Sequence, residues 1–139
     1  MSLKVQEIMI KDVITLGVKA SVNEAVKIMD EYQIGCLVVV ENGNAIGIVT
    51  ERDMLKRVLL EAKDPEATKI SQIMTAPLVV GNPQMTVQEA VELMTHKKIK
   101  KLPIAENGNI VGMVTLTDLV RSVAYLEHVF SKVYDNMPT

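Results

Sequence analysis

Residues 41–53 read ENGNAIGIVTERD, and residues 106–118 read ENGNIVGMVTLTD. These two stretches are the centre of a longer internal repeat, in which residues 5–57 align with residues 70–122 without a gap, at a constant spacing of 65 residues (41 to 106). Self-similarity over this length is typical of a duplicated structural unit. The sequence therefore predicts two copies of one fold.

Each copy predicts the order strand, helix, strand, strand, helix. Ser21 to Glu24 and Thr86 to Glu89 have the spacing of capping boxes, so the first helix of each copy is expected to begin there. An Asn-Gly pair between the last two strands is a strong hairpin signal. The expected class is α/β (α+β), with a small three-stranded sheet in each repeat. The strands are expected at 13–15, 36–40 and 45–49 in the first copy, and at 78–80, 102–105 and 110–114 in the second.

The repeats divide the chain into four parts: repeat 1 (5–62), a linker (63–69), repeat 2 (70–125) and a C-terminal helix extension (126–139). One copy has too small a core to be stable alone, so the two copies are expected to pair about a pseudo-twofold axis. The final helix adds apolar positions beyond the repeat, among them Val120, Val123, Ala124, Val129, Phe130 and Val133. This surface is a candidate for homodimerisation.

Composition excludes several classes of function. A formal net charge of −2 over 139 residues gives no general attraction for nucleic acid. The single cysteine rules out an internal disulfide, and no apolar run is long enough to cross a membrane, so a cytoplasmic protein is expected. The two histidines lack a nucleophile at triad spacing and no HExxH helix exists, so we expect neither catalysis nor a metal site.

Each hairpin leads into a helix through the pattern Gly-apolar-apolar-Thr-x-x-Asp, at residues 47–53 and 112–118. This pattern places a hydroxyl and a carboxylate at a helix start, where backbone N–H groups and the helix dipole favour anions. The carboxylate is suited to accept hydrogen bonds from the two hydroxyls of a ribose. The same spacing also describes a capping box, which is a purely structural role. Spacing alone does not decide between the two.

The tandem arrangement, the paired Asn-Gly hairpins and the run GIVTERD followed by Met54-Leu55 resemble CBS domains, from about Val5 to about Ser122. This resemblance implies a module with two clefts that bind adenosyl compounds such as AMP, ADP, ATP or S-adenosylmethionine. In each cleft, apolar side chains and strand backbone would hold the adenine, the Asp the ribose, and the Thr with nearby cations the phosphate.

The resemblance also implies which residues line the clefts. Those of cleft one are Thr50, Arg52, Asp53, Val79, Val80, Lys101, Leu102 and Pro103. Those of cleft two are Ile14, Thr15, Cys36, Leu37, Thr115, Thr117 and Asp118.

The two clefts are expected to differ in affinity. Residues 97–101 read KKIKK, whereas the matching residues 32–36 read YQIGC. With Arg52 added, cleft one should attract phosphate more strongly than cleft two, where Thr117 takes the place of the arginine. The alternative is that these lysines form a solvated helix end, where cations complement the helix dipole. Repeat 1 also departs from the family pattern, since it has Val38 where repeat 2 has Pro103.

The favoured hypothesis is an allosteric sensor of an adenine nucleotide or S-adenosylmethionine, which regulates an unidentified protein target in trans. One alternative is a structural dimerisation scaffold without a physiological nucleotide. A weaker one is RNA or DNA binding through the patch at residues 97–101.

Overall fold

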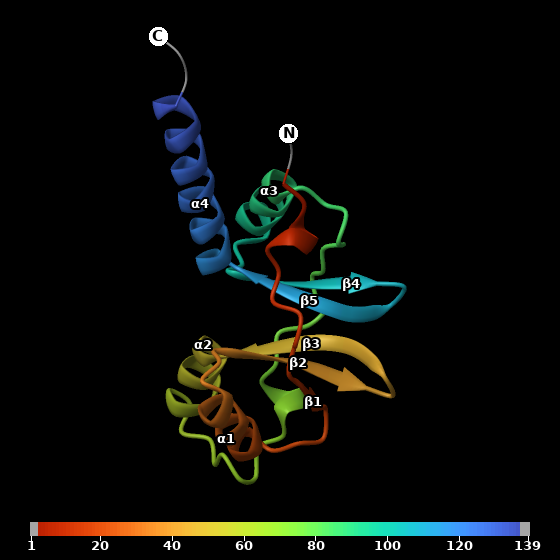
Figure 1. The fold of residues 1–139 in the computed structure, drawn as a ribbon. Helices are drawn as coiled ribbons and strands as arrows, with labels where there is room; N and C mark the ends of the chain where they lie inside the picture. Colours follow the sequence, from red (N-terminus) through yellow and green to blue (C-terminus); the bar gives the residue numbers. More distant parts are fainter. Residues whose placement is uncertain (1–2, 137–139) are drawn as a thin grey trace. The chain divides into compact units, whose positions relative to one another are not determined.

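The computed structural model describes the backbone of residues 3–136, and their side chains except at positions 125, 126, 129, 130, 133 and 134 of the final helix. Figure 1 shows the chain coloured along its sequence. The elements are a 3₁₀ helix η1 (Val5–Glu7), β1 (Thr15–Gly17), α1 (Val22–Tyr32), β2 (Cys36–Glu41), β3 (Asn44–Thr50), α2 (Glu51–Met54), a π-helical segment η2 (Leu55–Leu59), a 3₁₀ helix η3 (Ile70–Gln72), α3 (Val87–Lys97), β4 (Lys101–Glu106), β5 (Asn109–Thr115) and α4 (Leu116–Asp135).

Both predicted hairpins are present. Asn42 and Gly43 have φ angles of 51° and 80°, and Asn107 and Gly108 have φ angles of 52° and 80°. Two consecutive left-handed residues form the turn whose twist suits adjoining antiparallel strands, and Asn followed by Gly is the pair that adopts it at least cost. In the first repeat β1 pairs in parallel with β2, and β2 pairs antiparallel with β3.

The second repeat lacks a full first strand. Its sheet contains β4 and β5, and the residues predicted as a strand at 78–80 are followed by a single parallel bridge between Gly81 and Ile104. Repeat 1 extends its pairing through Val18, whose N–H donates to Val40 O at 3.0 Å. The residue that matches Val18 is Pro83, and the residue that matches Val38, whose N–H donates to Ile14 O at 3.4 Å, is Pro103. Neither proline has an N–H to donate, so the pairing is lost on both sides of Gly81.

The helix starts follow the predicted caps. Thr86 and Glu89 exchange both bonds of a capping box, with Glu89 N–H to Thr86 Oγ1 at 3.1 Å and Thr86 N–H to Glu89 Oε1 at 3.3 Å. At α1 only one of the two bonds forms, from Glu24 N–H to Ser21 Oγ at 3.1 Å. Within residues 3–136, no helix combines the length and the apolar run needed to span a bilayer.

The compact units of the structure do not follow the order of the repeats. Unit 1 contains residues 1–11, 80–106 and 111–139, and unit 2 contains residues 12–79 and 107–110. The segment that leads into each repeat is therefore packed with the other repeat. In unit 2, Ile70 N–H donates to Ala20 O at 2.8 Å, and in unit 1, Val5 N–H donates to Met85 O at 2.8 Å.

Each unit has its own buried apolar residues. The core of unit 2 is built from β1, α1, β2 and β3 together with Val58, Ile70 and Ile73. In unit 1 the buried apolar side chains include Val5, Ala90, Met94, Leu102, Ile104, Val114 and Leu119. Because Ile70 and Ile73 are fully buried, the lead-in of repeat 2 is a structural part of the first repeat's core.

Candidate functional site

The first Thr-x-x-Asp motif, here called junction 1, lies where β3 ends and α2 begins. Thr50 N–H donates to Asp53 Oδ2 at 2.9 Å, and the Thr50 hydroxyl donates to the same oxygen at 3.3 Å. In return, Asp53 N–H donates to Thr50 Oγ1 at 3.4 Å. Junction 1 is therefore a capping box, as the structural interpretation of the motif predicts.

Junction 2, formed by Thr115 and Asp118 where β5 meets α4, has the same arrangement. Thr115 N–H and Thr115 Oγ1 both donate to Asp118 Oδ2 at 2.9 Å, and Asp118 N–H donates to Thr115 Oγ1 at 3.3 Å. Asp53 and Asp118 are each 8% exposed. A carboxylate this buried is tolerated because it is hydrogen-bonded. The caps thus hold both carboxylates in place, each through its Oδ2 atom.

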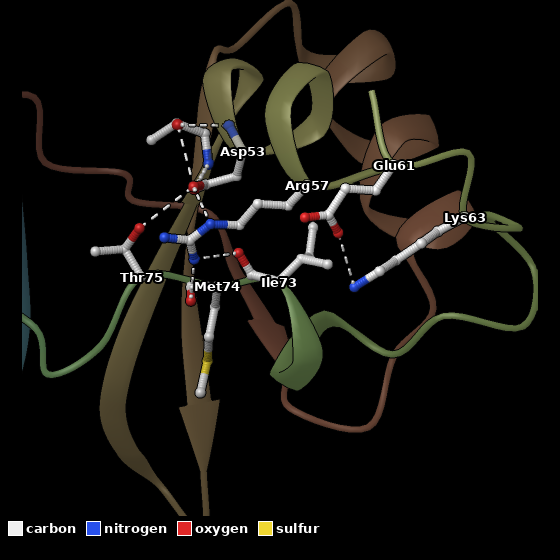
Figure 2. A network of polar contacts seen from close by, with 8 residues as sticks. Asp53, Arg57, Glu61, Lys63, Ile73, Met74 and Thr75 are labelled. Atoms are coloured by element: carbon white, nitrogen blue, oxygen red, sulfur yellow. Dashed lines mark hydrogen bonds and ion pairs between the residues drawn. The ribbon is translucent and has the colours of Figure 1, made fainter. Parts of the chain in front are cut away.

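The other carboxylate oxygen of Asp53 accepts one hydrogen bond and forms an ion pair (Figure 2). The Thr75 hydroxyl donates to Asp53 Oδ1 at 3.3 Å, and Arg57 Nε lies 3.9 Å from the same oxygen. Arg57 is anchored in turn, because its Nη1 donates to the carbonyl oxygens of Ile73 and Met74 at 2.9 Å each. The sequence analysis did not identify Thr75 or Arg57, because Thr75 is brought to Asp53 by the exchange of lead-in segments and no local pattern marks it.

The glycine of the motif serves the packing of the lead-in segments. A Cβ atom at Gly47 would lie 2.9 Å from Met74 Sδ and 2.9 Å from Thr75 O. At Gly112 it would meet the side chain of Met9 and lie 3.1 Å from Ile10 O. Any side chain at either position would push the lead-in backbone off the strand.

The helix starts at the junctions offer fewer open N–H groups than their position suggests. Glu51 N–H donates to Gly35 O at 3.1 Å, and Leu116 N–H donates to Lys100 O at 3.0 Å. Since the Asp N–H groups are bound to threonine hydroxyls, two of the first three N–H groups of each helix already have acceptors. Phosphate recognition at either junction would therefore depend mainly on cationic side chains.

The residues predicted for cleft one divide between the two units: Thr50, Arg52, Asp53 and Val79 belong to unit 2, and Val80, Lys101, Leu102 and Pro103 to unit 1. Arg52 is exposed and Val80 is 43% exposed, so both are accessible. Leu102 and Pro103 are fully buried. Neither residue is accessible to a ligand in this structure, and the assembly of the eight residues into one cleft stays a prediction.

The cleft two residues divide in the same way: Ile14, Thr15, Cys36 and Leu37 belong to unit 2, and Thr115, Thr117 and Asp118 to unit 1. Thr15 and Thr117 are exposed, whereas the Leu37 side chain is fully buried. Cys36 is the register partner of Thr50 across β2 and β3. The structure thus brings Cys36 next to a residue predicted for cleft one, and cleft two as a whole also stays a prediction.

The lysine patch at residues 97–101 lies at the end of α3. Lys97 is in the last turn, and Lys98 is the left-handed C-cap residue, whose N–H donates to Met94 O and Thr95 O. Cations at this end of a helix complement its dipole. Both side chains and that of Lys100 are exposed, whereas Lys101 begins β4 and is half-buried. The helix-end interpretation therefore accounts for Lys97 and Lys98 better than for Lys101.

Each unit also has an apolar groove between its two helices. The groove of unit 2 includes Val26, Met29, Ile34, Leu55 and Leu59, and the groove of unit 1 includes Val91, Met94, Ile99, Val120 and Val123. Most of these positions correspond through the sequence repeat. Neither groove includes Asp53 or Asp118. In the described part of the chain, no three His, Cys, Asp or Glu side chains gather as a metal site would require.

Comparison with known proteins agrees with these features. A family model described as CBS domain matches residues 5–60 and 70–125. The chain is similar to the CBS domain-containing protein YhcV of Bacillus subtilis, with 36% identity over 115 residues that cover 83% of this chain and 81% of that protein. Its similarity to the inosine-5′-monophosphate dehydrogenase of Methanocaldococcus jannaschii, 34% over 124 residues, covers 88% of this chain and 24% of that enzyme.

A solved structure with the same fold is that of a hexameric CBS-CP12 protein from bloom-forming cyanobacteria. It has a TM-score of 0.84 and 31% identity, and the match covers 91% of this chain and 75% of that one.

Proposed function

This chain belongs to the CBS domain family, and we propose that it is a regulatory module that binds an adenosyl ligand such as AMP, ADP, ATP or S-adenosylmethionine. The single observation that supports this most is the paired geometry of the junctions: each holds a nearly buried carboxylate at the end of a strand. In the proposed module, Asp53 would bind the ribose of one ligand and Asp118 the ribose of a second ligand.

The capping box and ribose binding are compatible roles for the same aspartate. A carboxylate has two oxygens and about four lone-pair sites. The cap uses Oδ2 at both junctions, so a ribose hydroxyl can bind at Oδ1 without unfolding the helix start. Because the cap fixes the side chain before the ligand arrives, less conformational entropy is lost on binding.

The proposed ligand acts as a regulator: we expect it to change how this protein binds a target in trans, and not to be turned over. The similarity to inosine-5′-monophosphate dehydrogenase covers 88% of this chain and 24% of that enzyme, so this chain matches a minor part of the enzyme. That match supports a non-catalytic role for the module.

Self-association is the second part of the proposal. The apolar grooves of the two units leave Leu55, Leu59, Val120 and Val123 more than half exposed, at 58%, 68%, 62% and 53%. Exposed apolar surface of this kind is typical of protein interfaces. The hexameric state of the cyanobacterial CBS-CP12 protein supports a second copy of this chain as the occupant. If no ligand bound, the same surface would favour the scaffold alternative.

Ligand-dependent stabilisation tests the proposal. A ligand at about 100 times its Kd adds about 2.7 kcal/mol to the free energy of unfolding, which for a chain of this size raises Tm by roughly 5–10 °C. We expect such a shift with at least one of AMP, ADP, ATP and S-adenosylmethionine. The double variant Asp53→Asn, Asp118→Asn should lose it, because the cap N–H groups keep the amide oxygen and the ribose then meets the amide nitrogen, which donates and cannot accept.

The matched control is Glu89→Gln, which alters the capping box of α3 at a place where no ligand is proposed. This variant should lower the baseline Tm slightly and keep the full ligand shift. If none of the four ligands raises Tm in the unmodified protein, the scaffold function is the better description.

A further inference from the structure

The two lead-in segments carry different side chains at the position that contacts the carboxylate in junction 1. Position 75 in unit 2 is Thr, and the matching position in unit 1 is Ile10. The backbone around them is nearly the same. Thr75 N–H donates to Ile48 O at 2.8 Å, and Thr75 O accepts from Ile48 N–H at 3.0 Å. Ile10 exchanges the same two backbone bonds with Met113 at 2.9 Å each. The side chain is therefore the main local difference.

The effect of this difference falls on one oxygen atom. Asp53 Oδ1 accepts from the Thr75 hydroxyl at 3.3 Å and has Arg57 Nε at 3.9 Å (Figure 2). In unit 1 the position that matches Arg57 is Ser122, whose hydroxyl donates to Leu119 O at 2.7 Å. Ile10 has no hydroxyl to donate. Within the described residues, the hydrogen bonds to the Asp118 carboxylate fall on Oδ2.

Asp118 Oδ1 remains in contact with solvent. No fully buried side-chain nitrogen or oxygen atom of the described residues lacks a hydrogen-bond partner. An oxygen that accepts no bond from the chain is therefore not fully buried. Asp118 Oδ1 has no donor among the described residues, whereas the equivalent oxygen of Asp53 already accepts one hydrogen bond, from Thr75, and has Arg57 nearby.

We propose that residues 75 and 10 set the ribose affinity of their junctions, with the Thr75 hydroxyl acting as an internal competitor for the ribose at Asp53. This inference rests on the proposed adenosyl function. A ribose that binds Asp53 must displace the Thr75 hydroxyl from Oδ1 or share the atom with it, whereas at Asp118 it displaces only water. The exchange of this one long hydroxyl–carboxylate hydrogen bond is worth about a three- to tenfold change in Kd.

Adenosine is the right probe, because it has the ribose and lacks the phosphates through which nearby cations would act. Titration followed by NMR resolves the two junctions in one sample, since the amide signals of Asp53 and Asp118 report on them separately. In Thr75→Val, which replaces the hydroxyl by a methyl group of the same shape, the Kd read at Asp53 should fall about three- to tenfold. The Kd read at Asp118 should not change.

The reciprocal variant introduces a competing hydroxyl at position 10. Ile10→Thr should raise the Kd for adenosine read at Asp118 about three- to tenfold. Ile10→Val has the same branched shape as Ile10→Thr without the hydroxyl, so the Kd read at Asp118 should stay within about twofold of that of the unmodified protein. Thr75→Ser keeps the hydroxyl, so the Kd read at Asp53 should also stay within about twofold. Thr75 and Ile10 are both exposed and bound through their backbones, so none of these changes removes a core contact.

The outcomes separate this inference from the function on which it rests. If adenosine binds and neither Thr75→Val nor Ile10→Thr changes the Kd at its own junction, the competitor role is wrong and the proposed function survives. A weaker Kd at Asp53 in Thr75→Val would overturn it too, since Thr75 would then assist the ligand. If neither adenosine nor ADP shifts either amide in the unmodified protein, the inference and the proposed function fail together.

Discussion

Asp53 and Asp118 each cap a helix start through the carboxylate oxygen Oδ2. A ligand would therefore bind at the other oxygen, Oδ1. The spacing of Thr and Asp predicted the cap as one of two possible roles, because the two residues are three apart and the bond is local, and the structure showed that the cap forms. The role of the glycine before them was not predictable in the same way. Gly47 is needed because Met74 and Thr75, remote in sequence, pack against its backbone.

Gly47→Ala tests that close approach. The new Cβ atom would lie 2.9 Å from Thr75 O, a backbone atom that cannot rotate away. We expect the free energy of unfolding to fall by about 1–3 kcal/mol, the usual cost of overpacking, measured from the denaturant midpoint. The control is Gly17→Ala, where a Cβ atom meets nothing within 4 Å. Equal stability of the two variants would contradict the packing role.

At the scale of elements, the helix pairs differ from the sheets in how completely they are covered. The strands β2 and β4 have buried central residues, whereas α1 with η2, and α3 with α4, leave apolar grooves open to solvent. The sequence analysis placed the dimer contact on the last helix. Val120 and Val123 of that surface line the groove of unit 1, while the side chains of Val129, Phe130 and Val133 lie outside the described residues.

Charge in this groove should block self-association. We expect the unmodified protein to be a dimer or larger by size-exclusion chromatography with light scattering, and Val120→Glu with Val123→Glu to shift it to the monomer, because burying two unpaired carboxylates is costly. Tyr32→Glu is the control, since Tyr32 is also 54% exposed and is not among the groove residues. A monomeric unmodified protein, or a double variant of unchanged mass, would contradict the proposed interface.

At the scale of the whole molecule, the duplicated sequence does not fold as two consecutive copies. Residues 70–79 complete the unit built on the first repeat, and residues 1–11 complete the unit built on the second. Ile70 and Ile73 are both fully buried in the core of unit 2. A repeat cut out along the sequence boundaries therefore loses part of its own core.

Fragments test this exchange directly. Residues 12–79 should retain cooperative thermal unfolding by circular dichroism, whereas residues 5–62, which lack Ile70 and Ile73, should be largely unfolded. Small domains of this size are marginal, so loss of two buried isoleucines, each worth about 1.5–3 kcal/mol, is enough to decide the outcome. If residues 5–62 unfold as cooperatively as residues 12–79, the lead-in segment is dispensable.

The sequence alone determined the duplication, the two hairpins and the cap at Thr86, and it predicted caps at Thr50 and Thr115 as one of two roles, because each depends on residues within a few positions of one another or on direct self-similarity. It also carried the family resemblance that points to an adenosyl ligand. Only the tertiary structure decided which lead-in segment packs on which repeat, that Pro83 and Pro103 cut short the second sheet, and that Thr75 and Arg57 reach Asp53 while the described residues donate to Asp118 through Oδ2. These features depend on backbone approach between distant segments, and no local periodicity encodes such contacts.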